Sequence, residues 1–241
     1  AGWPAVTPVS LPHSPLAAGL FWSAATVALY CAARRVHRLR PSWWTSPLAL
    51  APVLIVALAL ALHEGYEEYN QGTRWLLTML GPVTVAFALP IFEQREMIRR
   101  HWPVLTVGVV AGSAIAMLTA WGLASLLGLS ESVRLSLMPR SVSTPFAMTV
   151  SGDIGGIPDL TAVFVVLTGV FGAALGEILL HVLPLRTSLA RGALFGMGAH
   201  GAGVAQARQV GGEEGAIASL VMILAGLCNV LAAPLIALLI H

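Results

Sequence analysis

The chain contains 241 residues, of which 57% are hydrophobic and 10% are charged, and its formal net charge at pH 7 is +2. A soluble domain carries about 25% charged residues, so this composition excludes a soluble globular protein and is typical of one that spans a lipid bilayer. The arginines form no basic stripe interleaved with aromatic residues, which argues against nucleic-acid binding.

Six apolar runs are predicted to be membrane-spanning helices, because a helix needs roughly 20 apolar residues to cross the hydrocarbon core. In chain order they cover residues 16–33, 47–62, 75–92, 103–127, 159–183 and 216–240. The predicted fold class is therefore an all-α polytopic membrane protein. We expect residues 1–15 to be a trimmed Pro-rich N-terminal segment, residues 16–127 a scaffold of transmembrane helices, and residues 128–241 a core with two broken segments.

The charges of the loops predict the orientation in the membrane. The segments 34–40 ("RRVHRLR") and 93–101 ("EQREMIRRH") are rich in arginine and are expected in the cytoplasm. The acidic loop 63–72 ("HEGYEEYNQG") then lies outside, and so does the N-terminus.

Two stretches, 131–157 and 184–212, are too polar and too rich in glycine and proline for ordinary spans. Each could be one kinked span or a re-entrant hairpin that enters and leaves on the same side. As hairpins, they place Arg186 and Arg191 inside and the acidic "SGDIGGIPD" segment outside, in agreement with the positive-inside rule. We therefore favour hairpins over kinked spans.

The core also contains a short internal similarity. The segment 155–169 ("GGIPDLTAVFVVLTG") resembles 211–226 ("GGEEGAIASLVMILAG"), and each follows one of the broken stretches. A hairpin and a helix repeated once, beginning on opposite faces, form the inverted repeat of many secondary transporters. In such proteins the broken helices mark the binding site near the middle of the membrane.

The first break is predicted within "PRSVSTPFAM", residues 139–148. A hydroxyl residue followed by proline is typical of a helix start, and we expect a helix from Pro145 to Ser151 whose first amides are capped by a hydroxyl. A helix start inside the membrane attracts anions. The candidate binding residues are Arg140, Ser141, Ser143, Thr144 and Pro145. Alternatively, this is an ordinary capped helix in an outer loop without a ligand.

The second break is predicted at His200, which lies among glycines in "GMGAHGAGVAQAR", residues 196–208. An ionisable residue inside the membrane is a functional candidate, and histidine titrates near physiological pH. His200 could relay a coupling proton or bind a substrate oxygen, with Gly201 and Gly203 beside it. Alternatively, its ring only caps the broken helix.

Signals for other chemistry are weak. There is no nucleophile elbow, no zinc-protease motif and no phosphate-binding loop, so we do not expect an enzyme or a cofactor. The acidic loop near Tyr66 is interpreted as solvated rather than as a metal site. Cys31 and Cys228 lie within apolar runs, and no disulfide framework is expected.

Several motifs resemble the LrgB/CidB family, which includes the plastidial glycolate/glycerate translocator of plants. They are "SVSTPFAM", "IGGIPDLTAVFVVLTGVFGAALG", "ARGALFGMGAHGAG", "EEGAIASL" and "LLTMLGPVTVAFALPIFEQ". The resemblance covers residues 16–240. It implies an integral membrane protein that acts with a small holin-like LrgA/CidA subunit. Family members have been described as antiholin-like regulators of murein hydrolase export and as carriers of small monocarboxylates.

The family pattern matches this chain at 141–145 and at a further set of positions, which comprises Gly155, Gly156, Pro158, Arg191, Gly192, Gly196, His200, Gly203, Glu214 and Gly215. Three positions depart from it. Ser143 replaces the usual threonine, and Val204 and Gln206 stand where the family usually has threonine and arginine. Arg208 could replace that arginine only after a shift of helix register.

These observations together predict a carrier for small monocarboxylates of the glycolate, glycerate, pyruvate or lactate class in a bacterial inner membrane. Arg140 and residues 141–144 would hold the carboxylate, and His200 would form the opposite wall. We expect proton or sodium coupling, an LrgA/CidA-type partner and a homo-oligomer. The alternative is a holin-associated pore or regulator without a substrate site, which needs small residues for assembly but no polar groups inside the membrane.

Overall fold

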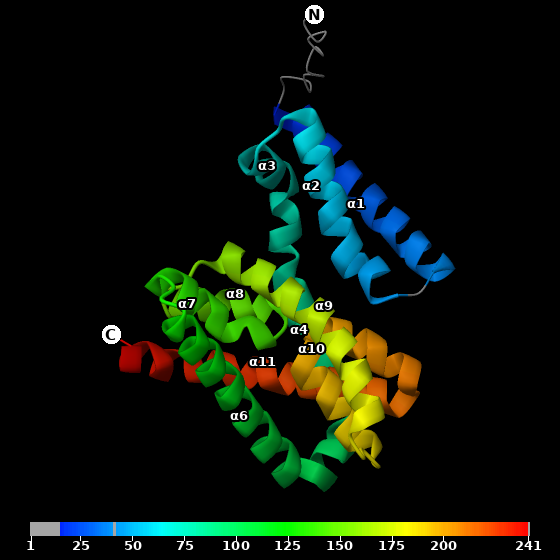
Figure 1. Cartoon of the computed structure of the whole chain (residues 1–241), viewed down its shortest axis with the longest axis vertical. Helices are drawn as coiled ribbons and strands as arrows, with labels where there is room; N and C mark the ends of the chain where they lie inside the picture. Colours follow the sequence, from blue (N-terminus) through cyan, green and yellow to red (C-terminus); the bar gives the residue numbers. More distant parts are fainter. Residues whose placement is uncertain (1–14, 41, 241) are drawn as a thin grey trace, which may run out of the picture. The chain divides into compact units, whose positions relative to one another are not determined.

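The computed structural model describes residues 15–40 and 42–240, and the regular structure of these residues is entirely helical (Figure 1). The predicted all-α fold is thus confirmed. The first helices are α1 (Pro15–Leu39), the 3₁₀ turn η1 (Trp43–Thr45), α2 (Pro47–Leu62), α3 (Tyr66–Thr78), α4 (Leu80–Ala86) and α5 (Ala88–Glu93). They are followed by α6 (Arg95–Leu126), α7 (Glu131–Leu137), the 3₁₀ turn η2 (Met138–Ser141), α8 (Thr144–Asp153), α9 (Pro158–Val182), α10 (Ser188–Val210) and α11 (Gly212–Ile240). Of the predicted N-terminal segment 1–15, all but Pro15 lies outside the described residues.

Four stretches of the described chain are long and apolar enough to cross a membrane: Tyr66–Glu93, Arg95–Leu126, Pro158–Val182 and Gly212–Leu239. They correspond to four of the six predicted spans, 75–92, 103–127, 159–183 and 216–240, to within one residue where a predicted span extends beyond its stretch. The predicted span 47–62 coincides with α2, which is apolar but has only 16 residues. The predicted span 16–33 lies in α1, which continues to Leu39 through an arginine-rich end.

The chain divides into two compact units, residues 1–81 and 82–241. In the first unit α1 packs against α2 and α3. Trp22 of α1 is fully buried, and its ring meets Tyr69 of α3 edge-on. Ser23 donates a hydrogen bond of 2.8 Å to the carbonyl of Gly72, which has no side chain to separate the two helices. The second unit contains both predicted breaks and is described below.

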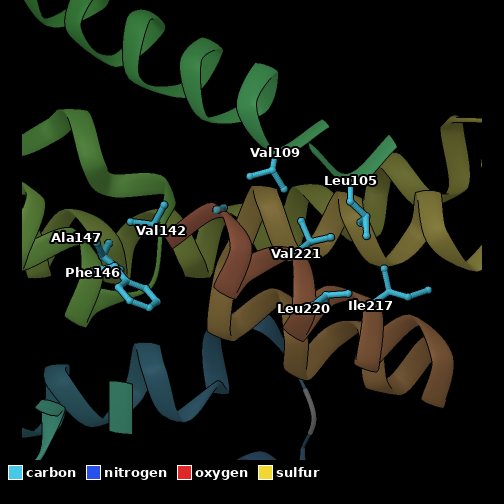
Figure 2. Close-up of a cluster of buried hydrophobic side chains, with 10 residues drawn as sticks. Leu105, Val109, Val142, Phe146, Ala147, Ile217, Leu220 and Val221 are labelled. Carbon is cyan, nitrogen blue, oxygen red and sulfur yellow. The ribbon is translucent and has the colours of Figure 1, made fainter. Parts of the chain in front are cut away.

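The core of the second unit is an apolar cluster between α6, α8 and α11 (Figure 2). Leu105 and Val109 of α6 face Val221 of α11, and Phe146 of α8 extends toward the same cluster. Phe146 packs on Gly226 of α11, where any added Cβ would overlap the ring. The first broken segment is therefore fixed on α11.

The first broken segment folds as a hairpin whose two ends are bonded together. The amide of Ile157, after α8, donates a 2.8 Å hydrogen bond to Oγ of Ser136 in α7. Thr161 Oγ1, at the start of α9, lies 3.0 Å from the carbonyl of Ser136 and 2.7 Å from Oγ of Ser151. All three hydroxyl residues are 0% exposed. The start and the end of the segment therefore lie next to each other.

The second broken segment, α10, also folds back on itself, at His200. A Cβ on Gly203 would overlap the carbonyl of Phe195, and Phe195 shares an apolar cluster with Ala207. In a straight helix, residues 12 positions apart would be separated by about 18 Å. At the open end of this hairpin, Arg191 pairs with Glu214 of α11 at 2.8 Å.

The two hairpins agree with the interpretation that the loop charges favoured. Arg100 and His101 of α6 line one cavity together with Arg186, so the two arginine-rich segments lie on the same side. Since α9 has 25 residues, it separates this side from the acidic residues at its other end by about 37 Å. Two kinked spans would have put these arginines on opposite sides.

We expect a membrane-impermeant maleimide to label Glu96→Cys and Arg186→Cys from one side of the membrane and Asp153→Cys from the other. The measurement uses right-side-out and inverted vesicles, in a chain where Cys31 and Cys228 are replaced by serine and alanine; the unmodified cysteine-free chain is the control. Labelling of Asp153→Cys from the same side as Glu96→Cys, and opposite to Arg186→Cys, would show that the first broken segment crosses the membrane as a kinked span.

Candidate functional site

The first break lies at Val142 and Ser143, whose backbones are extended between η2 and α8. Helix α8 runs from Thr144 to Asp153, slightly longer at each end than the predicted helix 145–151. The predicted hydroxyl cap is wrong, because the side chain of Ser143, at the N-cap position, forms no capping hydrogen bond. Pro145, in the first turn, has no N–H that needs a cap.

Ser143 instead leaves a polar group unused inside the protein. Its side chain is 7% exposed, and its Oγ is buried without a hydrogen-bond partner among the described residues. Buried polar groups in folded proteins are nearly always hydrogen-bonded, so an exception asks for an explanation such as a bound ligand or water.

The second break lies at His200, as predicted. Its φ of 35° is in the left-handed region, which is costly for a residue with a Cβ, and such strain concentrates at functional sites. The side chain is 5% exposed and its ring is hydrogen-bonded to the backbone of Val165 in α9. Nε2, however, is buried without a partner among the described residues.

The second hairpin packs against α9 over a row of glycines. A Cβ on Gly169 would lie 2.7 Å from Cε1 of His200, and a Cβ on Gly172 would overlap the carbonyl of Gly198. A Cβ on Gly176 would likewise lie 2.7 Å from Cε1 of the Phe195 ring. The absence of these side chains lets the strained turn lie directly on the α9 backbone, as small residues do where membrane helices approach closely.

A cavity of about 420 Å³ lies where the two broken segments meet α9. Its wall contains Arg140 from the first segment, Gly198 from the second, and Thr168 and Gly172 from α9. The remaining wall is apolar and consists of Leu137, Phe164, Leu167, Phe171 and Leu175. No carboxylate of the described chain forms an ion pair with Arg140.

The cavity brings together only part of the predicted set. Arg140 lines it, and His200 is two residues from the lining residue Gly198, whereas Ser141, Ser143, Thr144 and Pro145 do not line it. Gly203 is buried in the packing of the hairpin, and Gly201 is exposed beside open space. Thr168 and Gly172 were not predicted, because both fall in an apolar run and only the packing of α9 shows which face they occupy.

A second polar pair lies inside the unit, away from both breaks. Asn229 of α11 is 3% exposed and donates hydrogen bonds to Oγ of Ser113 at 2.9 Å and to the carbonyl of Ala225 at 2.7 Å. The pair lies at the wall of a larger, mainly apolar cavity of about 650 Å³ between α6, α7 and α11. Because its amide donors are satisfied, we interpret it as a link between α6 and α11.

Comparison with known proteins settles the relationship that the motifs suggested. The model of the LrgB-like family matches residues 26–239. The chain belongs to this family. The LrgB family match covers both hairpins, α9 and α11, and the predicted resemblance is confirmed.

Relatives of this LrgB-family chain occur in Bacillus subtilis (strain 168). The chain is 40% identical to the protein YwbG over 209 residues, which are 87% of this chain and 93% of that relative. It is 32% identical to the protein YxaC over 216 residues, 90% of this chain and 94% of that one. It is also 32% identical to the antiholin-like protein LrgB over 189 residues, 78% and 82% of the two chains. No solved structure matches the chain.

Gly203→Ala should destabilise the second hairpin, because the added methyl group would overlap the carbonyl of Phe195, a backbone atom that cannot rotate away. We expect a loss of about 1–3 kcal/mol, the usual cost of overpacking, measured as a lower midpoint of unfolding in detergent. Gly122→Ala in α6 is the matched control, since its Cβ meets nothing within 4 Å. Equal stability of the two variants would contradict the close contact in α10.

Proposed function

We propose that this LrgB-family membrane protein is a secondary transporter of small monocarboxylates of the glycolate, glycerate, pyruvate or lactate class. The observation that supports this most directly is Arg140, a guanidinium without an ion-pair partner in the described chain, in a cavity between two broken helices. The volume of about 420 Å³ lies within the usual range for small-molecule sites, about 300–1,000 Å³.

The chemistry of the cavity suits a short hydroxy or keto acid. A guanidinium binds a carboxylate through two parallel, charge-assisted hydrogen bonds. The hydroxyl of Thr168, on the facing helix, can donate to or accept from the substrate's own hydroxyl or keto oxygen. Phe164 and Leu167 leave no polar partner for a second charged group, which favours monocarboxylates over dicarboxylates.

His200 is proposed as the coupling residue. Its unpaired Nε2 lies at the second break, and its strained backbone holds it against α9. Histidine can change its charge near physiological pH, so proton uptake at this atom would link the substrate site to the proton gradient. Sodium coupling would leave His200 as a positioning residue instead.

In this proposal one hairpin-bearing repeat moves against the remaining helices, as in other transporters with broken helices. The protein acts in the bacterial cytoplasmic membrane without covalent chemistry. It assembles as a homo-oligomer and works with a small LrgA/CidA-type membrane protein.

The names of the relatives favour a second candidate function. Several of them, from Bacillus subtilis, Bacillus mycoides and Bacillus cereus, are called antiholin-like protein LrgB. Under this alternative the chain is a pore or a regulator of murein hydrolase export. It would then need no selective carboxylate site, and Arg140 would serve assembly.

Arg140→Gln should lower the initial rate of labelled glycolate or pyruvate counterflow into proteoliposomes by about 10–100-fold, because a charge-assisted hydrogen bond is worth about 1.5–3 kcal/mol. Arg140→Lys should retain part of the activity, since it keeps the charge but not the two parallel bonds. The exposed Arg38→Gln on α1 is the matched control and should transport like the wild type.

His200→Gln separates coupling from binding in the same assay: counterflow should persist while accumulation driven by a pH gradient is lost. The alternative function predicts a different pattern. A pore would release an encapsulated dye without selectivity, and Arg140→Gln would leave carboxylate flux unchanged.

A further inference from the structure

A second polar cavity lies at the arginine-rich end of the second unit. It has a volume of about 380 Å³ and joins three helices. Arg100 and His101 come from α6, Arg186, Thr187 and Ser188 come from the linker before α10 and its first residue, and Glu213 comes from α11. The cavity for the proposed carboxylate shares no residue with it.

The charges of this cavity are unbalanced. Two guanidiniums and one imidazole face a single carboxylate, that of Glu213. Within the described residues neither Arg100 nor Arg186 forms an ion pair, and Nδ1 of His101 is buried without a hydrogen-bond partner. The cavity therefore has spare hydrogen-bond capacity and, at neutral pH, a net positive charge.

The kink in α6 and the start of α10 add to this arrangement. His101 has non-helical angles because Pro103 interrupts the helix two residues later, and this kink brings the His101 ring to the cavity. Helix α10 has 23 residues and begins at the cavity. Thr187 Oγ1 caps the amide of Ala190 at 3.2 Å, whereas the amides of Ser188 and Leu189 have no acceptor within the helix. Such amides carry partial positive charge.

We propose that this cavity binds a phosphate group, either as a free phosphate or as the headgroup of an anionic lipid. A phosphate presents more acceptor oxygens than a carboxylate, and here two guanidiniums, a ring nitrogen and helix amides converge from different directions. The site lies at the end of a membrane-length helix, where headgroups are found.

A phosphate bound here connects α6 to the base of the second hairpin. Arg191, one turn into α10, pairs with Glu214, the neighbour of the lining residue Glu213. Occupation of the site would therefore stabilise the hairpin that carries His200. This binding does not depend on the proposed transport of monocarboxylates.

The test is thermal unfolding of the purified full chain in a neutral detergent, with inorganic phosphate compared with NaCl at equal ionic strength. Phosphate at a hundredfold excess over Kd should raise the Tm by about 5 °C or more. The variant Arg100→Gln with Arg186→Gln should lose this rise, whereas Glu213→Gln should need less phosphate. Arg35→Gln with Arg38→Gln, which removes the same two positive charges at exposed sites of α1, should respond like the wild type.

Nanodiscs distinguish the two sources of the phosphate group. A rise of the Tm in phosphatidic acid over phosphatidylcholine, abolished by Arg100→Gln with Arg186→Gln, identifies a lipid headgroup; a rise with inorganic phosphate in detergent alone identifies a soluble ligand. The proposal is overturned if neither phosphate source stabilises the wild type. It is also overturned if phosphate raises the Tm of two variants as much as that of the wild type: Arg186→Gln, at an exposed position, and Arg100→Gln with Arg186→Gln.

Discussion

A helix that is interrupted inside a membrane must have its freed polar groups covered by protein or by a wet cavity, and this constraint organises the second unit. Helix α9 provides the cover. Gly169, Gly172 and Gly176 remove the side chains that would keep the second hairpin away from its backbone. The hydroxyls of Ser136, Ser151 and Thr161 close the other hairpin beside the start of the same helix. Two of the buried side-chain atoms without a partner among the described residues, Ser143 Oγ and His200 Nε2, lie at the two breaks.

The second hairpin links the two cavities for which functions are proposed. One end of α10 begins at the arginine-rich cavity, and its turn at residues 198–200 borders the cavity of Arg140. Gly192 and Gly196 hold the first half of α10 against Ile217 and Ala218 of α11. A movement of this hairpin would therefore change both sites together, which is the behaviour expected of the mobile repeat of a transporter.

The helices predicted most accurately from the sequence are those that an apolar run of residues defines by itself. The apolar runs 47–62 and 159–183 match α2 and α9 within one residue, and the glycines around His200 located the second break. The predicted span 75–92 is divided into α3, α4 and α5, with breaks at Met79 and Phe87. Each break lies three residues before a proline, Pro82 or Pro90. A proline lacks the N–H of a helical hydrogen bond, and its ring disturbs the preceding turn. Pro52 and Pro234 lie within unbroken helices, so the presence of a proline does not by itself predict a break in a helix. The face of α9 that carries Thr168 depends on packing between distant segments, which no local pattern records.

The proposed transport requires that water and substrate reach the cavity between the two breaks and α9 inside the membrane. The most direct measurement is the reaction of Thr168→Cys, in a chain without Cys31 and Cys228, with a charged, membrane-impermeant thiol reagent. Leu231→Cys on α11, where the side chain is 80% exposed and apolar, serves as the lipid-facing control. A substrate site that water can reach at Thr168 predicts that Thr168→Cys reacts, that Leu231→Cys does not, and that glycolate slows the reaction. Equal lack of reaction at both positions, or a rate at Thr168→Cys that no monocarboxylate changes, would contradict it.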